Sequence, residues 1–222
     1  MGTSSSSLTP EFTPAGYEHM LTQLASLGYA LLPVEDIPAW TIGRAAYLRH
    51  DIDATIQGAP IIASIEERCL ARSSWHVRPD AHYNPWHEPN RQILQRLKDA
   101  GHTLGLHWTA AAAPAAALPF TPTSHSRHRP GTPPTLPPGV AYISDSGRAW
   151  RTTSPSITTL LAGNGPDRVL LLTHHEHWIG HAPALDEHYA TTITTLAATT
   201  VLDAIHDEYH AALNHPARQH AA

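Results

Sequence analysis

Residues 47–53 read YLRHDID, and this stretch decides how the chain is interpreted. Its apolar beginning is typical of a buried strand, and its end carries two carboxylates, Asp51 and Asp53. Residues two apart in an extended segment face the same side, so these carboxylates repel each other unless a cation lies beside them. One interpretation is a metal ligand next to a general base. The other is a strand-to-loop turn in which both side chains cap a helix or accept backbone N–H groups.

Two later apolar segments end in histidine. His107 follows residues 103–106, and His174 follows residues 169–173. Barrel-like α/β enzymes carry their catalytic groups at strand ends, so we expect both histidines near the acidic pair. A lone histidine at a strand end is also commonly a hydrogen-bonded core residue, so each position remains open to that interpretation.

Helical and extended patterns alternate along the chain. Apolar residues recur at helical spacing over 10–28, 60–72 and 89–100, and glycines follow at the ends of the first and third. Strands are predicted over 29–34, 45–48, 75–77, 103–106, 140–144 and 169–173. This alternation predicts an α/β domain with a mostly parallel sheet.

The length of 222 residues suits one domain. We expect a flexible tail over residues 1–10 and a single domain over residues 11–222. Within it, residues 110–138 are rich in Ala, Pro, Thr and Ser and show no periodic element, which predicts an irregular segment. Residues 184–210 predict a long C-terminal helix.

The composition excludes several classes of partner. The net charge of −5 argues against nucleic acid or an anionic membrane surface as a partner. No apolar run approaches the roughly 18 residues of a membrane span, and the first residues lack the pattern of a signal peptide. We therefore expect a cytoplasmic protein that acts on a small molecule. The single cysteine excludes an internal disulfide and a cysteine-based zinc site.

Other catalytic motifs are missing from the sequence. It contains no Gly-x-Ser-x-Gly elbow, no glycine-rich phosphate loop and no His-Glu-x-x-His. The 18 histidines are far more than ordinary usage, but one metal site uses three or four ligands at most. Position, and not abundance, must therefore identify a metal site.

Taken together, these residues resemble the polysaccharide deacetylase, or NodB-homology, superfamily, in its divergent branch with an Arg-His-Asp-x-Asp first motif. The similar segments are residues 49–53, 97–107, 128–131, 142–151 and 171–178. The resemblance implies a distorted (β/α)7 barrel. It also implies a metal-dependent hydrolase that removes an acetyl or similar acyl group from nitrogen.

The resemblance assigns roles to the polar strand ends. It implies that Asp51 is the general base, that Asp53 and His107 bind the metal, and that His174 is the general acid. The family has a second metal-binding histidine four residues after the first, and here that position is Ala111.

A replacement for the missing ligand is available close by in the sequence. We expect Asp53, His107 and His128 to form the ligand set, with His125 as the alternative third ligand. Arg129 then matches the arginine that orients the base, because a guanidinium can hold a carboxylate through two hydrogen bonds. We expect one divalent ion, zinc by default, with cobalt, nickel, iron or manganese as alternatives.

Several further residues are candidates for substrate binding. The aromatic ones stack a sugar or other ring in one interpretation and pack in the core in the other. Asp145 binds substrate or forms a salt bridge with Arg148 or Arg129. The candidates are Tyr83, Trp108, Asp145, Trp150 and Trp178. Because the chain shows no secretion signal, we expect an amino sugar or a biosynthetic intermediate as substrate.

Three other functions fit parts of this pattern. Ala111 favours a catalytically inactive relative that binds a ligand. Hydrolysis of a cyclic imide or ureide is a variant of the same chemistry. Two histidines with one carboxylate also suit a non-haem iron oxygenase.

Overall fold

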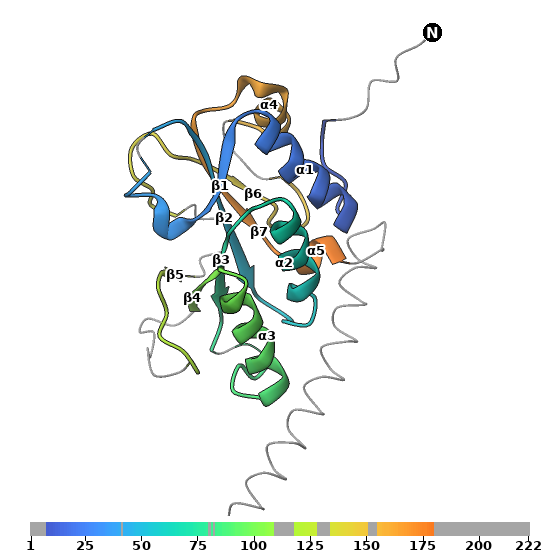
Figure 1. Cartoon of the computed structure of the whole chain (residues 1–222), viewed down its shortest axis with the longest axis vertical. Coiled ribbons are helices and arrows are strands. Elements are labelled where there is room, and N and C mark those ends of the chain that lie inside the picture. The colour runs from blue at the N-terminus through green and yellow to red at the C-terminus, as the bar shows by residue number, and fades with distance from the viewer. Residues whose placement is uncertain are drawn as a thin grey trace, which may run out of the picture.

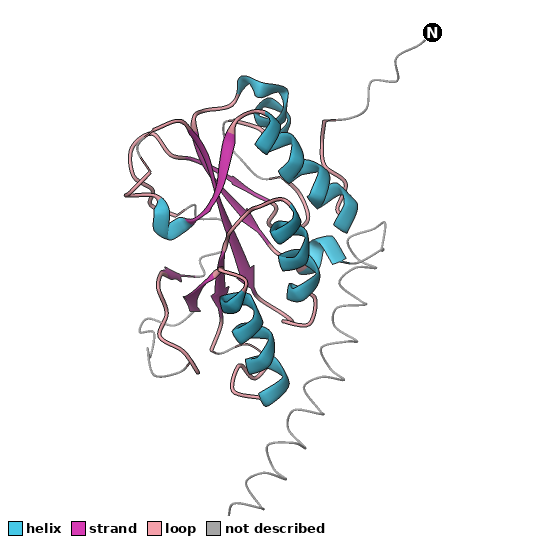
Figure 2. Ribbon diagram, viewed as in Figure 1, coloured by secondary structure: helices cyan, strands magenta, loops and turns pink. Residues whose placement is uncertain are grey.

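The computed structural model describes residues 8–40, 42–79, 81, 83–108, 118–127, 134–150 and 155–179. Strands and helices alternate along this part of the chain (Figures 1 and 2). The strands are β1 (Tyr29–Pro33), β2 (Arg44–Ile52), β3 (Ser74–Val77), β4 (Thr103–Trp108), β5 (His125–Arg127), β6 (Ala141–Ser144) and β7 (Arg168–Thr173). The helices are α1 (Pro14–Ser26), α2 (Ala59–Arg68), α3 (Glu88–Asp99), α4 (Ile157–Thr159) and α5 (Glu176–Ile179), with a 3₁₀ turn η1 (Val34–Asp36) and a π turn η3 (Leu160–Asn164).

The strands form one parallel sheet, curled into a half-barrel, with the order β5-β4-β3-β2-β7-β6. The long strand β2 organises it. Along one edge β2 pairs first with β1, over Arg44–Leu48, and then with β3, over Arg49–Ile52. Along its other edge it pairs with β7 over Ala45–His50. The α/β prediction is confirmed, and the strands all run in the same direction.

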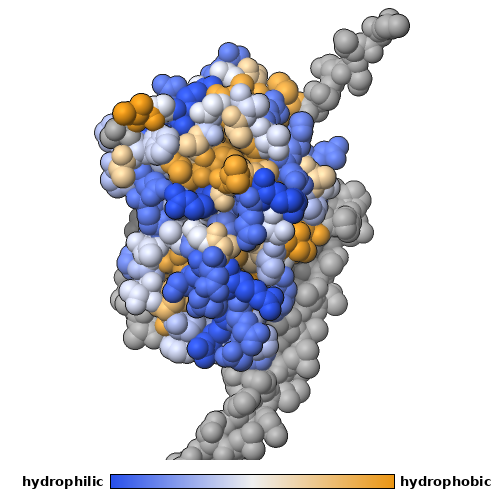
Figure 3. Space-filling view, viewed as in Figure 1, coloured by the Kyte–Doolittle hydropathy of each residue, from blue (hydrophilic) through white to orange (hydrophobic). Residues whose placement is uncertain are grey.

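The helices α1, α2 and α3 cover one face of the sheet and build the main core there (Figure 2). Along β2, Leu48 and Ile52 face these helices, while Tyr47 belongs to a smaller cluster on the other, concave face. This alternation follows from the two-residue period of a strand. The outer surface of α3 is hydrophilic (Figure 3), as expected of an amphipathic helix.

Local sequence signals set the ends of α1. The side chain of Thr13 accepts a hydrogen bond from the N–H of Gly16, and Pro14 occupies the first turn, where its missing N–H costs nothing. Gly28 follows the helix with a φ of +83°, a left-handed conformation that favours glycine. The predicted end of this helix is therefore confirmed.

The structure differs from the sequence predictions in three strands. The strand β4 continues past residue 106 to Trp108. The strand β2 continues past residue 48 to Ile52, because its polar residues are buried and paired, which an apolar pattern does not reveal. The strand β5 lies within residues 110–138, where no regular element was predicted. The helix predicted over 184–210 lies outside the described residues. Within those residues, no helix is long and apolar enough to cross a membrane.

Candidate active site

Polar side chains line the concave face of the sheet where its strands end. Arg49 and Asp51 come from β2, His76 from β3, His107 from β4 and Ser126 from β5. All five are buried. Their positions follow from strand periodicity, since each lies two residues from another residue of the same face or opposite one in the next strand.

Asp51 is fixed by a bidentate ion pair with Arg49. The guanidinium donates from Nε to Oδ1 at 2.8 Å and from Nη2 to Oδ2 at 2.7 Å. Burial alone would raise the pKa of Asp51, but the charge of Arg49 and its hydrogen bonds to the carboxylate outweigh burial and hold this pKa well below its usual range. Asp51 is therefore an ionised carboxylate of fixed orientation. Arg129, predicted for this contact, lies outside the described residues.

His107 lies between the two aspartates. Its Nε2 is 3.4 Å from Oδ1 of Asp53 and 3.5 Å from Oδ2 of Asp51. Asp53 also faces Nη1 of Arg78 at 3.9 Å, and 21% of its side chain is exposed to solvent. Burial would raise the pKa of Asp53, but its hydrogen bond with His107 and the charge of His174 lower it. The predicted convergence of Asp51, Asp53 and His107 is thus present.

His174 lies on the other side of Asp53. Its Nε2 is 3.6 Å from Oδ2 of Asp53, and its Nδ1 is 2.7 Å from Oδ1 of Asp145. Burial alone would lower the pKa of His174, but the charge of Asp145 and the hydrogen bond to it raise this pKa to about 10. His174 is therefore protonated at neutral pH and presents Nε2–H towards the centre of the site.

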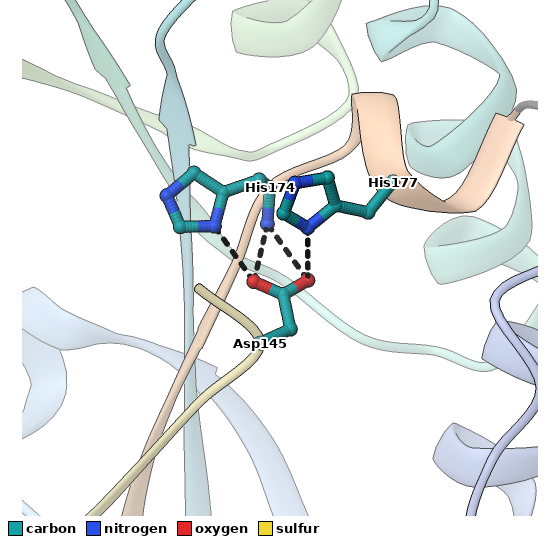
Figure 4. A group of neighbouring side chains, drawn as sticks. All are labelled: Asp145, His174 and His177. Carbon is teal, nitrogen blue, oxygen red and sulfur yellow. Dashed lines mark hydrogen bonds and ion pairs between the residues drawn. The ribbon is translucent and has the colours of Figure 1, made fainter. Parts of the chain in front are cut away.

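Asp145 accepts hydrogen bonds from the backbone and the ring of His174 and so holds this histidine in place (Figure 4). Its carboxylate accepts from the backbone N–H of His174 at 3.0 and 3.1 Å and from Nε1–H of Trp178 at 2.8 Å, with Nδ1 of His177 at 3.6 Å. One ligand atom each from Asp145, His174 and His177 lie within 4.8 Å of one another, so this buried group could hold a metal ion. The pairing of Asp145 with His174 was not predicted from the sequence, because it depends on β6 and β7 being neighbours in the sheet.

The two candidates for the third ligand, His128 and His125, differ in what the structure describes. His128 lies outside the described residues, as does Ala111, where the expected ligand is missing. His125, the alternative third ligand, belongs to β5 next to Ser126, whose hydroxyl reaches the site. Neighbouring strand residues face opposite sides, so His125 is directed away, and its ring lies edge-on to Trp108 with centroids 6.3 Å apart.

The predicted aromatic residues differ in their surroundings. Tyr83 is 1% exposed, donates its O–H to the carbonyl of Ile52 and accepts from the N–H of Arg78. Trp178 is fully buried, and Trp150 is half-buried and stacks on Phe12 with centroids 5.9 Å apart. Tyr83 and Trp178 are therefore buried supports of the site. Asp145, also predicted to bind substrate, instead accepts hydrogen bonds from His174 and Trp178.

Two buried groups near the site were not singled out from the sequence. Glu176, at the start of α5, is buried beside His174, and burial raises its pKa to about 8. His76 has Nδ1 3.9 Å from Oδ1 of Asp51, and burial together with the charge of Arg49 lowers its pKa to about 3. Their pKa shifts depend on tertiary contacts, which no local sequence motif predicts.

Comparison with known proteins adds no identification. No family model, no curated protein and no solved structure matches this chain.

Proposed function

We propose that this protein is a metal-dependent amide hydrolase that removes an acetyl or similar acyl group from the nitrogen of a small substrate. The observation that carries the proposal is the convergence of Asp51, Asp53, His107 and His174 at the carboxyl ends of β2, β4 and β7, three strands of the parallel sheet. The resemblance to polysaccharide deacetylases supports the same roles, with a distorted (β/α)7 barrel as the complete fold. An amino sugar or a biosynthetic intermediate is the proposed class of substrate.

The donor set suits a divalent ion. Asp53 and His107 offer a carboxylate oxygen and an imidazole nitrogen 3.4 Å apart, and His128 is the proposed third ligand. Oxygen and nitrogen donors of this kind are those of catalytic zinc sites. When bound, such an ion polarises a carbonyl group and lowers the pKa of water.

The proposed proton transfers use residues on either side of Asp53. Asp51, held by Arg49, takes a proton from the attacking water molecule. His174, held by Asp145, donates a proton to the departing amine nitrogen. Because both side chains are fixed by ion pairs, the base and the acid are positioned before the substrate binds.

The metal has two candidate positions, and we place it at Asp53 and His107. At the alternative position, both oxygens of Asp145 already accept hydrogen bonds, and the 2.7 Å contact with His174 is a hydrogen-bond distance. Zinc titration of two variants separates the positions. His107→Gln should lose tight zinc binding and His177→Gln should keep it, whereas the opposite result would move the metal to Asp145.

The reaction is tested with zinc-loaded and cobalt-loaded protein on a panel of N-acetylated amino sugars, N-acetylated amines, cyclic imides and ureides. Release of acetate or ring opening is measured. Asp51→Asn should abolish turnover and keep the metal, and Asp167→Asn, whose side chain is 82% exposed, is the matched control. Protein that takes up no divalent ion after dialysis against zinc or cobalt would contradict the proposal.

The second candidate function is a catalytically inactive relative that binds a ligand, and Ala111 is the observation that favours it. Asp51 and His174 favour the enzyme, because a binding protein needs neither a fixed base nor a fixed acid. Binding of panel compounds by metal-free protein, at the same affinity in Asp53→Ala, would support the inactive relative.

A further inference from the structure

Phe12, in the segment that precedes α1, packs against residues that hold Asp145. Its ring centroid lies 4.8 Å from that of Trp178. It stacks on Trp150, with centroids 5.9 Å apart and an angle of 18° between the ring planes. It also meets the ring of His177 edge-on, with centroids 6.1 Å apart. Rings that follow β6 and β7 in the chain therefore surround the side chain of Phe12.

Two of these rings connect Phe12 with His174, the proposed acid. The indole Nε1–H of Trp178 donates to Oδ2 of Asp145 at 2.8 Å, and Oδ1 of the same carboxylate lies 2.7 Å from Nδ1 of His174. The ring of His177 packs against the ring of His174, with centroids 5.1 Å apart. Phe12 thus contacts both a donor that fixes Asp145 and a ring that lies against the imidazole of His174.

The hydrogen bond from Trp178 to Asp145 depends on how the indole ring is packed. An indole has a single N–H, and its direction is fixed by the orientation of the ring. Three rings enclose this indole: Phe12 with centroids 4.8 Å apart, Tyr17 at 5.1 Å and Trp150 at 5.8 Å. Removing a packed side chain leaves a cavity into which its neighbours relax only in part. Loss of the Phe12 ring would therefore let the indole N–H turn away from Asp145.

Gly16 provides independent evidence that the segment before α1 is held in one place. Residues 8–13 run beside the first turns of α1 (Figure 1), and a Cβ at Gly16 would overlap the carbonyl oxygen of Glu11 and lie 3.0 Å from its carbonyl carbon. Gly16 does not have a positive φ, and glycine is unfavourable inside a helix. The close approach of Glu11 is therefore what requires glycine here. Arg148 adds a second constraint, because its Nη2 donates to the carbonyl oxygen of Phe12 at 3.4 Å.

We propose that Phe12 is a positioning residue for His174. Its ring fills the space beside Trp178 and so keeps the indole N–H on Asp145, and it supports His177 against the imidazole of His174. This inference rests on the proposed function for the role of His174. Phe12 carries no group that transfers a proton, so its contribution is to hold the acid in a productive position before the substrate binds.

The indole N–H of Trp178 reports on this packing directly in ¹H–¹⁵N NMR spectra of metal-free, ¹⁵N-labelled protein, with Trp178→Phe to assign the signal. In the wild type we expect an N–H that is hydrogen-bonded and exchanges slowly with solvent. Phe12→Ala should move this signal and speed its exchange. Gly16→Ala should act in the same direction, because the added methyl group displaces Glu11 and with it Phe12, although no aromatic ring is removed. An unchanged signal in Phe12→Ala would overturn the proposal.

Phe120→Ala is the matched control. Phe120 is the second of the two phenylalanines of the chain, and like Phe12 it is half-buried and packs against the core. It lies beside α3, in a surface pocket with Leu94 and Leu104. Phe120→Ala should therefore cost stability and leave the indole signal of Trp178 unchanged. An equal change of that signal in Phe120→Ala and Phe12→Ala would overturn the proposal, because it would show a general loss of packing.

Turnover of zinc-loaded protein gives the second readout, on the panel compound that the wild type hydrolyses fastest. Phe12→Ala should lower kcat by about 10–100-fold, because a displacement of about 1 Å in a catalytic group can cost about 100-fold. KM and zinc affinity should stay unchanged, since among the contacts that the structure describes Phe12 touches neither Asp53 nor His107. Unchanged kcat, or a loss of zinc affinity as large as the loss of kcat, would overturn the proposal. If the wild type hydrolyses no compound, the proposed function fails, and the indole signal of the metal-free protein still decides whether Phe12 holds Trp178 on Asp145.

Discussion

His50 and Asp51 are neighbours on β2 and face opposite sides of the sheet. On the helix side, Oε1 of Glu66 lies 2.9 Å from Nε2 of His50, and Glu66 also accepts from the hydroxyls of Tyr17 at 2.8 Å and Ser73 at 2.7 Å. On the concave side, the carboxylates lie close to histidines as well. One strand therefore carries two buried clusters of histidine and carboxylate.

The two clusters differ in closure, that is, in how short their hydrogen bonds are and whether solvent reaches the carboxylate. Around Glu66 the contacts are of hydrogen-bond length, and the side chains of Glu66 and His50 are fully buried. Around Asp53, imidazole nitrogens approach at 3.4 and 3.6 Å, longer than a good hydrogen bond, and solvent reaches the carboxylate. The same residue types thus hold the fold together on one face and form a site on the other, and closure distinguishes the two.

The largest expected effect comes from removing the charge of Asp53 in the concave cluster. Asp53→Asn removes a proposed ligand and should weaken zinc binding by more than about 100-fold, because even removing a group that only supports a ligand costs about 10–100-fold. The metal-free variant should be slightly less stable than the wild type, because the lowered pKa of Asp53 shows that His107 and His174 stabilise its charge more than Asp51 repels it. Zinc titration and urea unfolding measure the two quantities. A stability loss without loss of zinc binding would reverse the roles of the two clusters.

The closed cluster should respond in the opposite way. Glu66→Gln replaces a buried carboxylate by an amide with one acceptor oxygen, and should destabilise the protein by about 3–5 kcal/mol, because the hydrogen bonds that Tyr17, Ser73 and His50 make with this carboxylate are lost or weakened. Zinc affinity should stay unchanged in the folded variant. Urea unfolding of metal-free protein is the measurement, and Glu67→Gln, on the exposed side of the same helix, is the control. Loss of zinc binding in Glu66→Gln would show that the two faces are coupled.

The sequence predicted the concave cluster better than the closed one. Asp51, Asp53, His107 and His174 follow apolar segments, and parallel strands bring such ends together. Glu66 lies on the apolar face of a helix, and nothing in the local pattern reveals that its partner is on β2. Closure of a cluster is a property of tertiary packing, which a one-dimensional pattern does not record.

The hydrogen bond between Ser126 and His107 could not be predicted from the sequence for a different reason. Ser126 belongs to the segment over 110–138, whose composition predicts no regular element. Its position beside His107 follows only from the pairing of β5 with β4. Likewise, Asp145 is assigned to His174 only because β6 lies beside β7.

A pH series sharpens the comparison by isolating the charge of Glu66. Burial would raise the pKa of Glu66, but the charge and hydrogen bond of His50, the charge of His102 and the hydrogen bond of Ser73 outweigh burial and lower this pKa. A carboxyl group with a lowered folded-state pKa adds stability above its unfolded pKa, about 4.3, and this stability is lost as the pH falls through the folded value. The stability difference between the wild type and Glu66→Gln should therefore be largest near neutral pH and shrink below about pH 4. Urea unfolding at each pH measures it, and a difference that grows on acidification would contradict this account.

The smallest effect is expected at Tyr83, which is hydrogen-bonded to the backbone of Ile52, the residue before Asp53. Tyr83→Phe removes the O–H that donates to the carbonyl of Ile52 and accepts from the N–H of Arg78. The cost should be about 0.5–1.5 kcal/mol of stability, the usual contribution of such a hydrogen bond. Zinc affinity should change little, because Asp53 also faces His107 and His174. A marked loss of zinc affinity in Tyr83→Phe, measured beside its stability, would mean that Tyr83 fixes the position of Asp53. The open cluster would then depend on a closed, buried support, as His174 depends on Asp145.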